Sequence, residues 1–225
     1  QYLINFCKAR DKIAFAVNSV AEDLDTLWSM VRDTAYEGDT GVVIHLGKNV
    51  GKAYTDFRCM TNFSQCIQRV LEKCNSKNPE NKCKIILETS TKTKNGSDIF
   101  HNIIYFGQLA DQLRMDLGDK IYESRIGFCI DTAHIFGSGY DIRTREGVVK
   151  FFNLWDSCIG LDRICLIHLN DSGAELCSCR DIHHTLGGQE LDKKGKNTWG
   201  YIWGDISENA VTRDALRCFI EYCIK

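Results

Sequence analysis

The chain has 225 residues, of which 44% are hydrophobic and 26% charged, and this composition is ordinary for one substantial globular domain. The formal net charge of -2 argues against a protein that coats nucleic acid through bulk charge, and no apolar run is long enough to span a membrane. Twelve cysteines are scattered through helical and strand-like segments, which predicts reduced intracellular thiols rather than a disulfide framework.

The first predicted elements are a helix and a strand. Ser19–Glu22 has the pattern of a capping box, and apolar residues then recur at helical spacing until Gly38. The apolar run 41–44 follows and ends at His45. This run is predicted to be a buried strand that ends in an imidazole.

A second helix and a second strand follow in the same order. Apolar residues at helical spacing predict an amphipathic helix over about 60–71, and the strand 84–87 ends at Glu88. A polar, basic loop leads to a further helix predicted from about Asp98, which would contain His101 as a structural residue.

The third strand, 127–130, ends at Asp131, and His134 lies three residues further on. The stretch after it, through the glycine pair near 137–139, is predicted to be a loop. In α/β folds, sites lie at the carboxyl ends of the strands, so Asp131 and His134 are candidate ligands or catalytic groups.

The last part of the chain contains a helix over about 148–158 and a fourth strand, 164–167, which ends at His168. A long loop then carries Asp181, His183 and His184 before a final helix near 215–220. We assign His184 a structural or surface role because it stands beside a better candidate.

The strand-ending residues 45, 88, 131 and 168 are spaced by 43, 43 and 37 positions, which is the period of repeated β-α units. The fold class is therefore α/β, either a βα-barrel or a doubly wound sheet. No glycine-rich phosphate motif follows a strand, which disfavours a nucleotide cofactor. The pair Cys177 and Cys179 is spaced too closely for the usual zinc knuckle.

The polar residues at the strand ends form a candidate metal-ligand set. Nitrogen and oxygen ligands together suit zinc or manganese, and so many of them indicate more than one ion. The candidates are His45, Glu88, Asp131, His134, His168, Asp181 and His183.

Several motifs together resemble the endonuclease IV family of apurinic/apyrimidinic (AP) endonucleases, especially members from large DNA viruses. The motifs are Asp131-Thr132-Ala133-His134, His168-Leu169-Asn170-Asp171-Ser172, Leu87-Glu88-Thr89, Ile44-His45-Leu46-Gly47 and Tyr2-Leu3-Ile4-Asn5. The resemblance covers essentially the whole chain and implies a TIM (β/α)8 barrel that is incomplete here, with about four parallel strands in one domain spanning 1–225.

The resemblance also implies three zinc ions, with manganese as an alternative. His45 resembles a ligand of the first ion, and Glu88 resembles the carboxylate that bridges the first and second. Asp131 and His168 resemble ligands of the second ion. The third ion would be held by the remaining candidates, which are His134, Asp181 and His183.

The implied reaction is hydrolysis of the phosphodiester on the 5′ side of an abasic site in duplex DNA, in base excision repair. It leaves a 3′-hydroxyl and a 5′-deoxyribose phosphate. The catalytic groups would be Glu88, Asp131, His134 and His168. Tyr2 and Leu3 align with the segment that wedges into the duplex, and the lysine-rich loops would contact phosphates.

Three features depart from the family pattern. The motif D-R-H is Asp181-Ile182-His183 here and lacks the arginine. One family histidine ligand would precede Tyr2 and one glutamate ligand would follow Lys225, so we expect only the third site to have all its protein ligands.

Two other functions remain open at this point. A sugar isomerase or epimerase of the same barrel superfamily also gathers Glu, Asp and His at strand ends, although its site needs fewer histidines. An inactive fragment that binds DNA or a partner is the non-enzyme alternative. For the endonuclease we expect a monomer when complete, no membrane association, and a place in the cytoplasm or nucleus of a host cell or in a virion.

Overall fold

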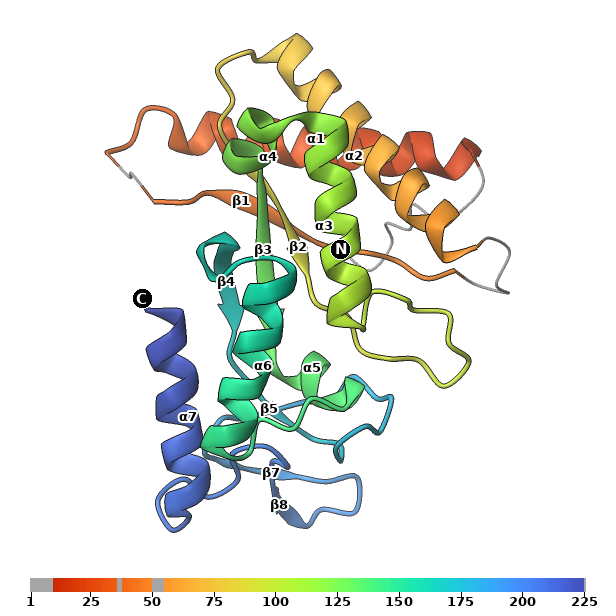
Figure 1. Cartoon of the computed structure of the whole chain (residues 1–225). Coiled ribbons are helices and arrows are strands. Elements are labelled where there is room, and N and C mark those ends of the chain that lie inside the picture. The colour runs from red at the N-terminus through yellow and green to blue at the C-terminus, as the bar shows by residue number, and fades with distance from the viewer. Residues whose placement is uncertain (1–9, 36–37, 50–54, 225) are drawn as a thin grey trace. The chain divides into compact units, whose positions relative to one another are not determined.

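The computed structural model describes residues 10–35, 38–49 and 55–224, which form two compact units (Figure 1). The first unit comprises the described residues of 1–88 and 107–129, and the second those of 89–106 and 130–225. The helices are α1 (Arg10–Val31), α2 (Asp56–Lys77), α3 (Ile103–Leu117), α4 (Asp119–Arg125), α5 (Thr132–Ser138), α6 (Arg145–Cys158) and α7 (Ala210–Cys223), with a 3-10 turn, η2 (Leu161–Arg163). The strands are β1 (Gly41–His45), β2 (Lys84–Glu88), β3 (Ile126–Asp131), β4 (Ile164–His168), β5 (Asp171–Ser172), β6 (His183–His184), β7 (Gln189–Leu191) and β8 (Asn197–Trp199).

The main sheet has the strand order β1-β2-β3-β4, as the β-α period predicts. In the first unit, β1 pairs in parallel with β2, and β2 pairs in parallel with β3. The four strands end at His45, Glu88, Asp131 and His168. The prediction that each apolar run stops at one of these polar residues is therefore confirmed. Strands β2 and β3 are buried, whereas most residues of β1 and β4 are only partly buried, so the prediction of a buried strand at 41–44 is wrong in that respect.

Helices α1 and α2 pack together in the first unit. The fully buried side chains of Leu24, Ile44 and Phe63 belong to its core. Thr55 caps α2 by accepting a hydrogen bond from the Arg58 backbone N–H (3.2 Å), which satisfies one of the free donors of the first turn.

Two predicted helix starts in the sequence are wrong. α1 begins at Arg10, so the pattern at Ser19–Glu22 lies inside the helix. α3 begins at Ile103, because the Asp98 carboxylate instead accepts a hydrogen bond from the Phe100 N–H (3.1 Å), which forms a local turn. His101 lies in this turn and not in a helix, with its Nδ1 2.6 Å from the Asp98 carbonyl oxygen.

Helices α6 and α7 pack together in the second unit through aromatic side chains. The Phe152 ring lies 4.9 Å from the Phe219 ring and stacks on Tyr222 at 4.4 Å, as measured between centroids. These contacts follow from the apolar spacing that predicted both helices.

The stretch after β3 is a helix, α5, and not the predicted loop. The Asp131 carboxylate caps it by accepting from the His134 N–H (3.0 Å), and Gly139 ends it in the left-handed conformation with φ 108°. The His134 side chain therefore projects from the first turn of a helix that begins directly after the strand.

Four short strands in the second unit lie in the segment that the sequence predicts as a long loop. β5 pairs antiparallel with β6, which places Ser172 opposite His183 and Asp171 opposite His184. β7 and β8 form an antiparallel hairpin. Strands of two or three residues are too short to produce a recognisable alternation of polar and apolar residues.

The buried carboxylate of Asp171 holds the loop that follows β8. Its Oδ1 accepts from the N–H groups of Ser172 and Ile202, both at 2.7 Å, and its Oδ2 accepts from Trp203 (3.0 Å) and Gly204 (2.9 Å). A Cβ atom on Gly200 would lie 2.1 Å from the carboxyl carbon of Asp171, so only glycine fits there. Four N–H donors thus stabilise a charge that is fully buried.

None of the described helices is both long enough and apolar enough to cross a membrane.

The eleven described cysteines are free thiols in different surroundings. Burial raises the pKa of the Cys66 thiol to about 11, whereas Cys177 is exposed. An aromatic disulfide reagent at about pH 8 should therefore label Cys177 quickly and Cys66 only after unfolding. Mass spectrometry of labelled peptides measures this, and Cys177→Ser should remove the fast phase. Equal labelling rates for both thiols in the folded protein would contradict the expectation.

Candidate metal centre

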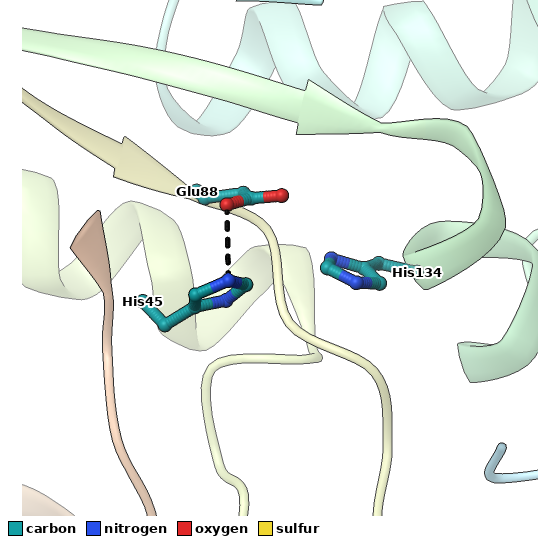
Figure 2. A group of neighbouring side chains, drawn as sticks. All are labelled: His45, Glu88 and His134. Atoms are coloured by element: carbon teal, nitrogen blue, oxygen red, sulfur yellow. Dashed lines mark ion pairs between the residues drawn. The ribbon is translucent and has the colours of Figure 1, made fainter. Parts of the chain in front are cut away.

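The first set of candidate ligands lies in the first unit, at the ends of two neighbouring strands. His45 and Glu88 are register partners of β1 and β2, and His45 Nε2 lies 3.3 Å from Glu88 Oε2 (Figure 2). The Glu88 carboxylate is buried, with 3% of the residue exposed. A buried carboxylate beside an imidazole can hold a cation between them.

The second set lies in the second unit and centres on two carboxylates. Asp181 Oδ1 lies 3.2 Å from His134 Nε2 and 3.3 Å from His183 Nε2. Asp131 Oδ2 lies 3.5 Å from the same His183 nitrogen. The three predicted ligands of the third ion are therefore brought together, and Asp131 joins them.

The distances from Asp181 Oδ1 to His134 Nε2 (3.2 Å) and to His183 Nε2 (3.3 Å) are those of neighbouring ligands on one metal ion. Ligand atoms about 2.0–2.1 Å from a zinc ion lie roughly 3.3 Å from one another at the corners of a tetrahedron. Ligand atoms of Asp131, His134 and His183 all lie within 4.8 Å of one another. Two imidazoles and two carboxylates are also the donor types that zinc and manganese accept.

The His134 ring is oriented by a backbone carbonyl. Its Nδ1 lies 2.8 Å from the carbonyl oxygen of Thr89, which can only accept a hydrogen bond. Nδ1 therefore carries a proton, and Nε2 is the ring nitrogen that faces the carboxylate of Asp181. Imidazole ligands of metals usually have such a partner on the second nitrogen.

Asp131 is held by hydrogen bonds on every side. Its backbone N–H donates to Thr89 Oγ1 (2.9 Å), its Oδ1 caps α5, and its Oδ2 accepts from Asn170 Nδ2 (3.0 Å). The side chain is completely buried. Its Oδ2 therefore faces the histidines in a fixed position. The sequence motif predicts Asp131 as a ligand, but the orientation of its carboxylate depends also on Thr89 and Asn170.

His168 lies at the edge of the second set. Its Nδ1 is 3.7 Å from Asp131 Oδ2, and its side chain is 39% exposed. The Thr132 hydroxyl donates to the carbonyl oxygens of His168 (3.2 Å) and Asn170 (2.6 Å), which ties the end of β4 to the start of α5.

Asp181 is positioned by a backbone segment that runs against the C-terminal end of α5. The N–H groups of Cys177 and Cys179 donate to the carbonyls of Phe136 and Gly137, both at 3.1 Å. Both cysteines have φ 57°, a left-handed conformation that costs energy for a side chain with a Cβ atom. The two cysteines thus shape the turn that leads to Asp181.

The structure groups the seven predicted ligands in two sets, one in each unit. The predicted DNA-wedge residues Tyr2 and Leu3 lie outside the described residues. Thr89, Thr132 and Asn170 were not predicted as site residues, although all three lie within or beside the quoted motifs.

Comparison with known families identifies the fold family of the chain. The model of the xylose isomerase-like TIM barrel family matches residues 20–199, which is most of the chain. The chain therefore belongs to this family, as the β-α period and the four parallel strands indicate.

Several proteins similar to the chain are named as endonuclease 4 or as an AP endonuclease. The chain is 33% identical over 197 residues to a protein of Acanthamoeba polyphaga mimivirus named as an endonuclease 4, which covers 86% of this chain and 58% of that protein. It is 31% identical over 156 residues to an apurinic-apyrimidinic endonuclease of Caenorhabditis elegans, covering 69% of this chain and 35% of the relative. The resemblance to the endonuclease IV family is confirmed.

Solved structures show the same likeness. The crystal structure of AsfvAP:AG, from the African swine fever virus AP endonuclease, matches 99% of this chain and 61% of that one, with a TM-score of 0.66 and 25% identity. Endonuclease IV from Thermus thermophilus has the same fold, with a TM-score of 0.62 at 18% identity, and the match covers 99% of this chain and 73% of that one. The chain spans about three fifths of the length of the mimivirus relative.

Proposed function

We propose that this chain is part of a metal-dependent DNA-repair endonuclease that hydrolyses the phosphodiester on the 5′ side of abasic sites in duplex DNA. The observation that carries the proposal is the second set, in which Asp181 Oδ1 lies within 3.3 Å of two imidazole nitrogens. Relatives named as endonuclease 4 and as an AP endonuclease support the reaction class.

Zinc is the ion we propose, with manganese as the alternative, because both accept imidazole and carboxylate ligands. His45 would be a ligand of the first ion, and Glu88 would be a ligand of both the first and the second. Asp131 and His168 would hold the second ion. The third ion would be held by His134, Asp181 and His183. Bound there, the ions would supply an activated water and electrostatic stabilisation of the phosphate.

The protein's own groups would then orient the reaction. Thr89 keeps the His134 proton on Nδ1, and Asn170 fixes the direction of the Asp131 carboxylate. In the hydrolysis, the water oxygen forms a bond to phosphorus while the bond to the 3′ oxygen breaks. The products are a 3′-hydroxyl and a 5′-deoxyribose phosphate.

Contacts to DNA complete the proposal. Tyr2 and Leu3 would wedge into the duplex at the abasic site, and the basic loops would contact phosphates. A repair enzyme of this kind would act as a monomer where viral or host DNA lies, in the cytoplasm or nucleus or in a virion.

Incision of a duplex that carries one tetrahydrofuran abasic analogue tests the proposal. The endonuclease of which this chain is part should cut on the 5′ side, and both chelation and His134→Ala should lower the rate by roughly a hundredfold or more. Chelation removes the ions that stabilise the transition state, and the substitution removes one ligand of such an ion. Denaturing gel electrophoresis separates the product.

His101→Gln is the matched control, since the ring of this histidine bonds the backbone of its own turn and should leave incision unchanged. Incision that survives both chelation and His134→Ala would falsify the metal mechanism. Interconversion of a ketose and an aldose without incision would instead favour the sugar isomerase that the family description also allows.

A further inference from the structure

The second unit also contains a cavity beside the candidate metal ligands, and most of the residues that line it are not candidate ligands. The β7–β8 hairpin and strand β6 line this cavity of about 390 Å³, which we call the hairpin cavity. Its size is at the lower end of the range for small-molecule sites, about 300–1,000 Å³. His183 lines the same cavity, so the cavity adjoins the second set of ligands.

Two aromatic side chains of this cavity remain accessible. Trp199, at the end of β8, is 36% exposed, and Tyr201 is 48% exposed. The other described tryptophans in this unit, Trp155 and Trp203, are fully buried. Trp199 and Tyr201 are thus the aromatic rings of the cavity that a planar ligand could reach.

A buried polar group in the cavity lacks a hydrogen-bond partner. His184 lines the cavity and is only 7% exposed. Its Nδ1 lies 3.2 Å from the Thr185 carbonyl oxygen, whereas its Nε2 forms no hydrogen bond in the described part of the chain. A buried ring nitrogen without a partner costs free energy unless a ligand or water supplies one.

The cavity is lined by one more cationic side chain than anionic ones, which favours binding of an anion slightly. Arg180, Lys193 and Lys194 line it together with Glu190 and Asp192. Hydrogen bonds from Thr185 lower the pKa of the Glu190 carboxyl, and backbone hydrogen bonds from Lys196 and Lys194 lower that of Asp192. Both acids therefore stay charged and accept hydrogen bonds from backbone N–H groups, so the cavity has three cationic and two anionic side chains in its lining.

We propose that the hairpin cavity binds one unpaired nucleotide of the DNA strand that passes the metal centre. Its base stacks on Trp199, its edge pairs with His184 Nε2, and its phosphate faces Lys193 and Lys194. Aromatic stacking accepts every base, because every base has a π-face, so the cavity holds a nucleotide without reading its identity. The inference rests on the proposed function for the choice of DNA as the partner.

Binding measurements can separate this site from the cleavage reaction. The zinc-supplemented chain is titrated with two fluorescent duplexes that carry the abasic analogue and a hydrolysis-resistant linkage on its 5′ side. One duplex is otherwise fully paired, and the other has a single unpaired thymidine beside the lesion. Fluorescence anisotropy gives the dissociation constant of each.

The wild-type chain should bind the duplex with the unpaired thymidine about tenfold more tightly, within the range of one base stacked on an aromatic ring. Trp199→Ala should abolish this preference, and Trp199→Phe should retain most of it. Lys193→Ala with Lys194→Ala should weaken binding of both duplexes. Lys196→Ala is the matched control in the same turn, because this lysine does not line the cavity.

Equal affinity of the wild-type chain for the two duplexes would overturn the inference, as would an equal loss on both duplexes in Trp199→Ala. Incision of a cleavable, fully paired duplex is measured alongside. Normal incision without the thymidine preference refutes only the hairpin cavity, whereas a preference without incision refutes the proposed function.

Discussion

Replacing Asp131 by alanine should lower incision by about a thousandfold or more, a loss of roughly 4 kcal/mol in transition-state stabilisation. One carboxylate oxygen of Asp131 lies 3.5 Å from His183 and 3.7 Å from His168, so its loss would remove a shared ligand from the second set. Zinc content by elemental analysis should fall together with the rate.

Two further variants separate the metal role of Asp131 from its role as a helix cap. Asparagine is also a good N-cap, because its Oδ1 can still accept from the His134 N–H, but its NH₂ would face the single Asn170 donor. Asp131→Asn should therefore lower the free energy of unfolding by about 1–2 kcal/mol, less than Asp171→Asn does, while incision is still lost. Asn170→Ala removes the hydrogen bonds that Asn170 Nδ2 donates to the Asp131 carboxylate and to the His168 carbonyl oxygen, and should weaken metal binding by about 10- to 100-fold. Full incision by Asp131→Asn would show that this carboxylate is not a ligand.

Replacing Asp171 by asparagine should lower the free energy of unfolding by about 3 kcal/mol, although Asp171 is not among the proposed ligands. Each of its two carboxylate oxygens accepts hydrogen bonds from two backbone N–H groups. In asparagine, an NH₂ group would replace one of these oxygens, and two of the four N–H groups would lose their acceptor. Urea denaturation followed by circular dichroism measures the change.

Asp141→Asn is the control for that experiment. The Asp141 carboxylate forms an exposed ion pair with Arg143 at 2.7 Å, and such pairs contribute little to stability, so its replacement should cost less than about 1 kcal/mol. If the two substitutions cost the same, the hydrogen bonds of Asp171 do not stabilise the loop as we infer.

The parts of the fold that the sequence predicts correctly are those with continuous patterns. Each strand of the main sheet is an apolar run that stops at a polar residue, so the strand ends at His45, Glu88, Asp131 and His168 can be located from one sequence. The predicted ligands of the third ion also lie together in the second unit.

What the sequence does not predict depends on hydrogen bonds between distant residues or on very short elements. α5 has seven residues and includes Gly137, so it shows no helical period. The contacts of Asn170 with Asp131 and of Thr89 with His134 join residues 39 and 45 positions apart. No local pattern reports such pairs, and no local pattern shows that Trp199 and His184 line one cavity.

The space around Gly200 limits how this region could be redesigned. Because a side chain there would collide with the Asp171 carboxyl group, residue 200 must remain glycine. The segments on its two sides differ in how well they would tolerate an insertion. The hairpin turn before residue 200, where a Cβ built on Gly195 would have no atom within 4 Å, is surrounded by open space and leaves room for a longer loop. An engineer who wished to alter the proposed nucleotide site could thus lengthen the turn at 193–196 and leave 200–204 as they are.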